Sequence, residues 1–99
     1  MKTWYVYIVR CKDGTYYTGI TTNIERRIEE HNSGIGAKYT RSRIPVELEE
    51  CKEFKNRSEA SKEECRIKKL TRVKKERLIG EWRVERLRYK HVIDQTIKE

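Results

Sequence analysis

The chain has 99 residues and a formal net charge of +8, and 40% of its residues are charged. This length fits one compact domain, and no stretch approaches the ~20 apolar residues of a membrane span. Three cysteines without a Cys-x-x-Cys pair argue against a disulfide framework or a structural zinc site. We therefore expect a soluble cytoplasmic protein in which Cys11, Cys51 and Cys65 behave as small buried hydrophobes.

The N-terminal segment has the pattern of a β-hairpin. Residues 4–11 and 15–21 are rich in aromatic and β-branched side chains, and the turn-forming pair Asp13-Gly14 lies between them. The length of the turn decides which side chains share a face of the sheet, because side chains alternate with period two.

The two possible turns place the tyrosines differently. A two-residue loop sends Tyr7 and Tyr17 to opposite faces, whereas a three-residue loop over residues 12–14 sets Tyr7 opposite Gly19 and brings both phenols to one face. We favour the three-residue loop, because Gly14 can supply the left-handed residue of a type I turn with a G1 bulge. The alternative role for these tyrosines is ordinary strand packing.

Caps, breakers and periodicity predict the remaining elements. Thr22 and Glu25 have the spacing of a capping box. The expected elements are a helix from about Asn23 to the Asn32-Ser33-Gly34 stop, a basic loop over 35–45, a strand over 46–54, a helix from a Ser58 cap to about Leu70, and a helix from Thr71 through Ile79. Gly80 is the expected stop or break.

The resulting order is β-β-α-β-α-α. It predicts an α/β (α+β) domain over residues 1–80, built on a small sheet that contains an antiparallel hairpin. Residues 81–99 are expected to form a C-terminal helical extension, because Trp82, Tyr89 and Ile93 roughly follow a helical stripe.

Arg27 and His31 lie four residues apart on the first expected helix, so they share one face. Ile24 and Ile28 border the same stripe, which turns this polar pair towards packed structure. A guanidinium offers parallel donors to a phosphate, and an imidazole can donate to it or move protons near neutral pH. The alternative is a His31 favoured by the dipole of the helix end and a surface Arg27.

Glu64 lies near the apolar stripe that Ala60 and Ile67 form on the second expected helix. A carboxylate turned towards a core needs a partner or a metal ion. Helical geometry does not single it out, because Glu63 lies at least as close to the stripe. One carboxylate can hold a Mg²⁺ ion that keeps several waters and takes substrate phosphate as further ligands.

Positive charge is concentrated in the second half of the chain. Residues 1–54 hold nine basic and eight acidic side chains, and residues 55–99 hold fifteen and eight. Such an excess of basic side chains is expected where a protein contacts the phosphate backbone of a nucleic acid. The alternative is a helix face that is only solvated. The residues that we expect to contact nucleic acid are Lys38, Arg41, Arg43, Lys68, Lys69, Arg72 and Lys75.

Several short elements occur in a fixed order: Tyr5-Val6-Tyr7, Tyr17-Thr18-Gly19, Arg27 and His31, and Glu64-Cys65-Arg66-Ile67-Lys68. This set resembles the GIY-YIG nuclease superfamily over about Trp4 to Ile79. The chain is most similar to short stand-alone bacterial members, through Tyr17–Thr22 and Gly36–Arg41. Tyr-Val-Tyr replaces Gly-Ile-Tyr and Tyr-Thr-Gly replaces Tyr-Ile-Gly, with the tyrosines kept in both. The resemblance implies a three-stranded antiparallel sheet flanked by helices.

The resemblance also implies catalytic roles for five residues. Tyr7 and Tyr17 line the site beside a bound water, and Arg27 contacts the scissile phosphate. Glu64 binds the single divalent cation, Mg²⁺ or Mn²⁺, and is selected over Glu63 by the motif Glu-x-x-Ile-Lys. Gly19 has the structural role of keeping the sheet face open. His31 matches a position that is histidine in several branches of the family.

Three functions compete at this point. The first is a metal-dependent endonuclease acting on DNA, such as structured or damaged DNA in repair or recombination. The second is a non-catalytic nucleic-acid-binding module, and the third is a protein-interaction adaptor. The five filled polar positions favour the nuclease. A tyrosine with an ordinary pKa near ~10 acts as a base only if the metal or Arg27 lowers that pKa.

Partners follow from the same features. We expect a monomer that binds DNA, or RNA, and no membrane. The sequence carries no appended DNA-binding domain, so specificity is expected to be low or to come from a protein partner.

Overall fold

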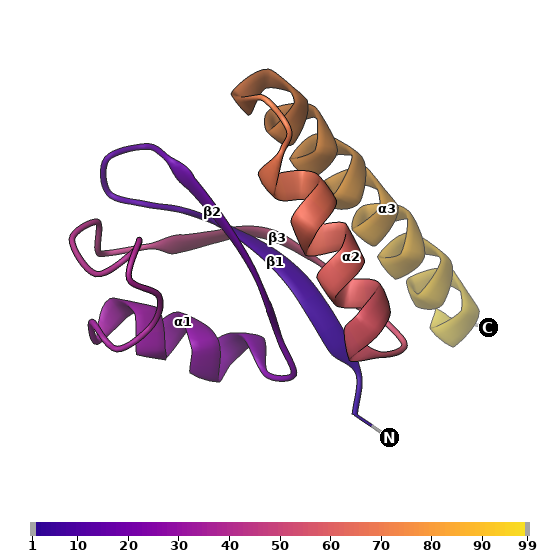
Figure 1. Cartoon of the computed structure of the whole chain (residues 1–99). Coiled ribbons are helices and arrows are strands. Elements are labelled where there is room, and N and C mark those ends of the chain that lie inside the picture. The colour runs from indigo at the N-terminus through magenta and orange to yellow at the C-terminus, as the bar shows by residue number, and fades with distance from the viewer. Residues whose placement is uncertain (1, 99) are drawn as a thin grey trace.

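Three antiparallel strands form the centre of the structure, a computed structural model that describes the backbone of residues 2–98 and the side chains of residues 2–88. The elements are β1 (Trp4–Arg10), β2 (Tyr16–Thr21), α1 (Ile24–Asn32), β3 (Glu47–Phe54), α2 (Arg57–Lys68) and α3 (Arg72–Lys98). The strand order is β2-β1-β3. Helix α1 lies on one side of the sheet, and α2 and α3 lie on the other (Figure 1). The α+β class and the order β-β-α-β-α-α are confirmed.

The three-residue turn of the hairpin is confirmed. Tyr7 pairs with Gly19 and Val9 with Tyr17, and the backbone of Gly14 has φ 85°. The Asp13 carboxylate accepts hydrogen bonds from the backbone N and the hydroxyl of Thr15, at 3.1 and 2.6 Å. Gly14 supplies the left-handed conformation that the bulged turn requires.

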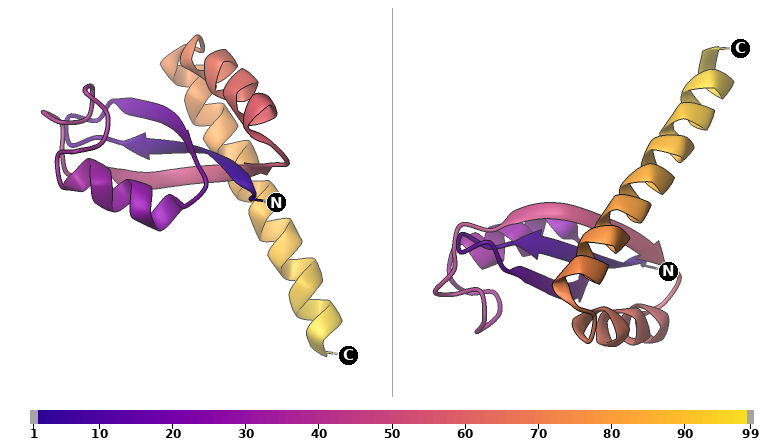
Figure 2. Two further views of the ribbon diagram at one scale, coloured as in Figure 1. Left: turned by 60° about the horizontal axis from the view of Figure 1, so that its bottom comes forward. Right: turned by 90° about the horizontal axis from the view of Figure 1, so that it is seen from above.

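Alternate side chains of β1 enter two different cores. Val6 and Ile8 point to one face, where they pack with residues of α2 and α3, including Ala60, Ile67 and Trp82. Tyr7 and Val9 point to the opposite face, towards α1. The left view of Figure 2 also shows the strands between α1 and the α2–α3 pair. One strand therefore contributes to two chemically different layers.

Asparagines, not the predicted residues, cap the first two helices. Asn23 caps α1 by accepting a hydrogen bond from the amide of Arg26, where we expected Thr22. Asn56 caps α2 by accepting from the amide of Glu59, where we expected Ser58. Both asparagines have extended backbones that let the side-chain oxygen reach an unpaired amide of the first turn. Ser58 falls inside the first turn and cannot do this.

Gly80 does not break the last helix, and this prediction was wrong. Helix α3 runs from Arg72 to Lys98 and extends well past the sheet (Figure 2). Glycine costs a helix about 1 kcal/mol relative to alanine. Burial of Ile79 and Trp82 on either side opposes that cost. The division between residues 1–80 and 81–99 stays a prediction, and the side chains of Tyr89 and Ile93 lie outside the described residues.

The buried carboxylate of Glu50 on β3 also attaches α3 to the sheet. It accepts hydrogen bonds from Arg86 at 3.0 and 3.3 Å, and Arg83 lies 3.6 Å away.

The three cysteines are free and differ in burial: Cys11 is buried, Cys51 is half-buried and Cys65 is exposed. The expectation that all three are buried is therefore wrong, because Cys65 lies on the solvent side of α2.

Candidate active site

A buried tyrosine and a buried histidine form the centre of the candidate site. The hydroxyl of Tyr7, on β1, lies 2.8 Å from Nε2 of His31, on α1, and both residues are fully buried. Nε of Arg27 lies 3.4 Å from the same hydroxyl. The four-residue spacing on α1 thus turns Arg27 and His31 towards the sheet face that carries Tyr7.

Tyr17 joins this cluster from β2. Its ring meets the ring of His31 edge-on, with centroids 5.4 Å apart, while Tyr7 meets the same imidazole at 5.8 Å. Gly19 leaves the space that the Tyr7 ring fills, because a Cβ at position 19 would overlap the ring and its hydroxyl. The structure thus brings Tyr7, Tyr17, Arg27 and His31 together on one face. We call these four residues the phenol cluster.

Glu64, on α2, lies near enough to Tyr7 for its charge to act on the phenol. It is half-buried, and its negative charge is among the influences that raise the pKa of Tyr7. Lys68, one turn later, pairs with its carboxylate at 3.5 Å. Glu63 instead pairs with Arg66. Of the two adjacent glutamates, Glu64 is the one whose charge acts on Tyr7.

Burial sets the protonation of the central pair. It raises the pKa of Tyr7 to about 12, against the hydrogen bond and the charge of Arg27, which lower it. Burial also lowers the pKa of His31; the positive charge of Arg27 acts in the same direction, and Glu30 opposes it. Tyr7 is therefore a neutral phenol and His31 a neutral imidazole at pH 7. A tyrosine was expected to act as a base only if the metal or Arg27 lowers its pKa. In the protein alone, the pKa of Tyr7 is raised instead.

Thr40 and Gly36 belong to the cluster, and sequence reasoning missed both. The hydroxyl of Thr40 lies 2.7 Å from Nδ1 of His31, and Thr40 is fully buried. A Cβ at Gly36 would overlap the imidazole ring. Gly36 and Thr40 lie within the segment Gly36–Arg41 that carries the family resemblance, but only the basic residues of this loop were assigned a function. Nothing local indicated that the loop folds back onto His31.

The predicted nucleic-acid contacts fall into separate places. Lys38, Arg41 and Lys69 are exposed. Arg43 binds Asp13 at 3.0 Å and the Tyr39 carbonyl at 2.7 Å, so it holds the loop to the hairpin turn. Lys68, Arg72 and Lys75 instead border a tyrosine-lined surface next to the site. Lys68 and Lys75 line a cavity that includes Tyr17, whereas Arg72 lines the neighbouring cavity with Tyr16 and Tyr39.

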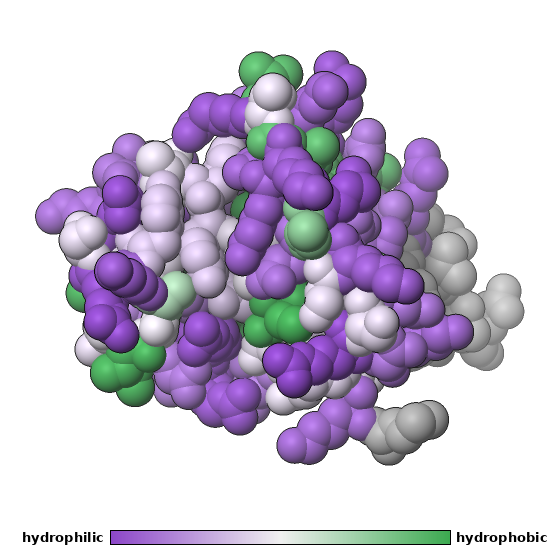
Figure 3. Space-filling view, in the orientation of Figure 1, coloured by the Kyte–Doolittle hydropathy of each residue, from purple (hydrophilic) through white to green (hydrophobic). Residues whose placement is uncertain are grey.

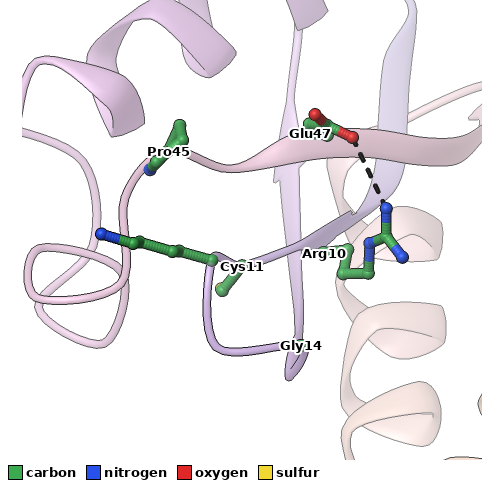
Figure 4. A pocket seen from close by; sticks show the side chains of 6 residues that line it. Arg10, Cys11, Gly14, Pro45 and Glu47 are labelled. Atoms are coloured by element: carbon green, nitrogen blue, oxygen red, sulfur yellow. Dashed lines mark ion pairs between the residues drawn. The ribbon is translucent and has the colours of Figure 1, made fainter.

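A separate cavity lies at the hairpin turn. Figure 4 shows Arg10 and Glu47 on its rim, paired at 3.6 Å, and its volume is about 220 Å³. None of the predicted catalytic residues lines it. The phenol cluster is thus a better candidate site than this cavity.

Hydrophilic side chains cover most of the face seen in Figure 3, and the apolar surface there is broken into small areas.

The residues present fit a single weakly held cation. Among the described residues, no group of three or more His, Cys, Asp or Glu side chains could enclose a metal ion. Glu64 offers one half-buried carboxylate whose charge acts on Tyr7. This donor set suits Mg²⁺, which keeps several waters and takes ligands from a substrate phosphate.

Comparison with known proteins identifies the family. Residues 3–77 match the model of the GIY-YIG catalytic domain. The chain therefore belongs to the GIY-YIG family, a nuclease superfamily whose enzymes generally depend on divalent metal ions.

Proteins named UPF0213 are similar to this chain over most of their length. One from Halobacterium salinarum is 55% identical over 75% of this chain and 96% of its own length. One from Clostridium perfringens is 49% identical over 91% and 97%. The solution NMR structure of a protein from E. faecalis has a TM-score of 0.60 and 46% identity, covering 85% of this chain and 90% of that one. That of a UPF0213 protein from Bacillus halodurans has a TM-score of 0.52 and 50% identity, covering 79% and 83%. The fold expected from the resemblance is thus confirmed.

Within the described part of the chain, none of the helices has the length and apolar character needed to cross a membrane.

Proposed function

We propose that this protein is a metal-dependent nuclease that hydrolyses phosphodiester bonds in DNA, with branched or damaged DNA of repair or recombination as the first substrates to test. The observation that carries the proposal is the convergence of Tyr7, Tyr17, Arg27, His31 and Glu64 from β1, β2, α1 and α2. Three consecutive elements and the more distant α2 supply these polar side chains. Family membership makes phosphodiester hydrolysis the chemistry to test.

Glu64 is the residue that would hold Mg²⁺ or Mn²⁺. When bound, the cation would offset negative charge on the oxygen that leaves phosphorus. In the protein alone, Lys68 neutralises this carboxylate at 3.5 Å, so cation binding and the position of Lys68 are coupled.

Arg27 binds and orients the phosphate. Its Nη1 pairs with Glu30 at 3.0 Å, which fixes the guanidinium on the α1 side of the cluster. The remaining N–H groups can bind two oxygens of a phosphate and offset the charge that develops there.

Tyr7 and His31 provide a route for the proton of the attacking water. As the water oxygen bonds to phosphorus and the ester P–O bond breaks, Tyr7 can accept the water proton while it passes its own proton to Nε2 of His31. This exchange never forms a free phenolate, which a pKa of about 12 makes costly. Solvent protonates the leaving oxygen and later restores neutral His31.

Cleavage of a panel of labelled DNA and RNA structures with Mg²⁺ or Mn²⁺ tests the proposal. Wild-type protein is expected to cleave at least one DNA structure, and Glu64→Ala to bind it without cutting. Glu63→Ala is the matched control, because Glu63 pairs with Arg66 instead; it should cleave as wild type does. Cleavage retained in Glu64→Ala would exclude this site.

The alternative is a non-catalytic nucleic-acid-binding module. It would bind the same panel and cut none of it under any metal condition.

We also propose that the protein works as a monomer in the cytoplasm, with substrate specificity low or supplied by a protein partner.

A further inference from the structure

A cavity of about 300 Å³ lies beside the phenol cluster, between β2, the loop after α1 and the basic helices. Its lining residues are Tyr16, Tyr17, Thr18, Tyr39, Lys68 and Lys75. The rings of Tyr17 and Tyr39 are stacked, with centroids 5.9 Å apart and planes 20° apart. We call this set of residues the tyrosine groove. It combines aromatic rings with two ammonium groups, and no other cavity described above does so.

Lys68 connects the tyrosine groove to the candidate site. Its Nζ lies 5.7 Å from the centre of the Tyr17 ring and 3.5 Å from the carboxylate of Glu64. Tyr17 in turn contacts His31. A strand that lies in the groove would therefore continue directly into the site.

Thr18 gives an independent indication of a ligand. It is 3% exposed and lies in the wall of the groove. Its hydroxyl oxygen is the single buried side-chain polar atom without a hydrogen-bond partner among the described residues. Buried polar groups of this kind are normally satisfied, so a partner from outside the chain would complete the site.

We propose that the tyrosine groove binds an unpaired base of a DNA strand, while Lys68 and Lys75 contact the phosphates next to it. The inference rests on the proposed function and narrows its substrate to DNA that is locally single-stranded. Basic helices alone would suit a duplex equally well, because phosphate contacts carry no such distinction. Aromatic rings distinguish the two forms, since only an unpaired base exposes a face on which they can stack.

The test of this proposal measures DNA binding under conditions that prevent cleavage. The protein carries Glu64→Ala, the buffer contains EDTA, and the probes are a short labelled single strand and the duplex of the same sequence. Tyr39→Ala should weaken binding of the single strand about tenfold, within the ~1–3 kcal/mol per stacked base seen elsewhere. Binding of the duplex should not change. Tyr39→Phe should bind as its parent does, and Ile35→Ala, an exposed residue of the same loop, is the control for loop substitution.

A second measurement needs no groove variant. 2-Aminopurine placed along the single strand should lose fluorescence at one or two adjacent positions when it stacks on the tyrosines. Equal weakening of single strand and duplex by Tyr39→Ala, or unchanged fluorescence at every position, would overturn the groove and leave the nuclease proposal intact. Failure of the parent protein to bind any nucleic acid would overturn both.

A second, independent inference comes from the hydrogen bonds around His31. The Thr40 hydroxyl lies 3.0 Å from the carbonyl of Ala37 and 2.7 Å from Nδ1 of His31. Since the hydroxyl has a single hydrogen and the Ala37 carbonyl can only accept, that hydrogen goes to Ala37, and Nδ1–H donates to Thr40. The competing donor to Nδ1, the Ala37 amide, is 3.5 Å away, which makes it a weak partner.

We infer that Thr40 is a positioning residue that holds His31 in the Nδ1–H tautomer. Nε2 then carries a free lone pair aimed at the Tyr7 hydroxyl, 2.8 Å away. The opposite tautomer would present an N–H to Tyr7 and could not receive its proton. The catalytic consequence rests on the proposed function, whereas the tautomer itself does not.

Nitrogen-15 NMR of the imidazole tests the tautomer directly. The chain has two histidines, so a His91→Gln background isolates the signals of His31. Wild type and Thr40→Ser should show a protonated Nδ1 and a bare Nε2, and Thr40→Val should show a mixture or a reversal. In cleavage, Thr40→Val should lower kcat with KM little changed, and Thr40→Ser should restore it.

Two results would overturn this inference. One is an Nε2–H tautomer in wild type, which decides the question even if Thr40→Val fails to fold. The other is an unchanged Nδ1–H tautomer in a folded Thr40→Val. A confirmed tautomer with no cleavage by any variant would contradict the proposed function alone.

Discussion

The two faces of the sheet differ in chemistry although a single strand supplies both. On the α2–α3 face, Val6 and Ile8 pack against an apolar set that includes Ile67 and Trp82. On the α1 face, Tyr7 is hydrogen-bonded to His31, which is bonded in turn to Thr40, and all three are fully buried. The first face buries apolar area, and the second buries a polar chain whose members satisfy one another.

This difference separates stability from chemistry. Apolar burial stabilises the fold without demanding exact partners. A buried polar chain stabilises little on balance, and each member becomes costly when its partner is lost. We therefore expect the apolar core of the α2–α3 face to determine whether the domain folds. The polar chain of the α1 face, together with Glu64 on α2, is expected to determine what the domain does.

The largest effect is expected for Tyr7→Phe, which removes one hydroxyl from the α1 face. Cleavage should fall about 10²–10⁴-fold, the usual contribution of a positioned proton-transfer group. The free energy of unfolding should fall by only about 1–3 kcal/mol, because Nε2 of His31 loses its partner. Cleavage rates and urea unfolding measure the two quantities. Tyr5→Phe, on the same strand outside the cluster, should alter neither, and full cleavage by Tyr7→Phe would contradict the assignment.

Ile67→Ala tests the other face. Ile67 is fully buried between α2 and the sheet, and its truncation should cost about 2–5 kcal/mol of unfolding free energy. Any protein that remains folded should cleave normally. Val73→Ala, at a residue that is 65% exposed, should change stability by less than about 0.5 kcal/mol. Equal losses in the two variants would show that the α2–α3 core does not dominate stability.

A smaller effect is expected from pH, again on the α1 face. The folded-state pKa of His31 lies below its ordinary value, so as pH falls below ~6.5 the unfolded chain takes up this proton first. Stability from this group should be fully present above that pH and lost as pH falls through the folded-state pKa. Urea unfolding across this range should show the loss in wild type and a reduced slope in His31→Gln. Matching slopes would assign the pH dependence to other groups.

The smallest effect concerns the glycine in the middle of α3. Nothing lies within 4 Å of a Cβ built on Gly80, so Gly80→Ala should raise the unfolding free energy by about 0.5–1 kcal/mol. Thermal unfolding measures it. Gly14→Ala should do the opposite, because Gly14 has φ 85° and alanine is strained there. A loss of stability in Gly80→Ala would mean that the helix needs flexibility at this point.

The sequence by itself determined the hairpin and its register. Asp13-Gly14 and the alternation of side chains are local properties, and they favour the register that places Tyr7 opposite Gly19, which the structure confirms. The spacing of Arg27 and His31 fixed their common face on α1 for the same reason. Helix ends were predicted less well, because Thr22 and Asn23 are both acceptable caps for α1, as are Asn56 and Ser58 for α2. Only backbone geometry shows which residue caps each helix.

Tertiary structure decided what depends on distance across the chain. It gave a physical difference between Glu64 and Glu63, which helical periodicity did not separate and only the family motif did. It placed Thr40 against His31, nine residues away across an irregular loop, and it raised the pKa of Tyr7 by burial. A pKa and a hydrogen-bond partner depend on the atoms that surround a group in space, and neither helical nor strand periodicity specifies those atoms.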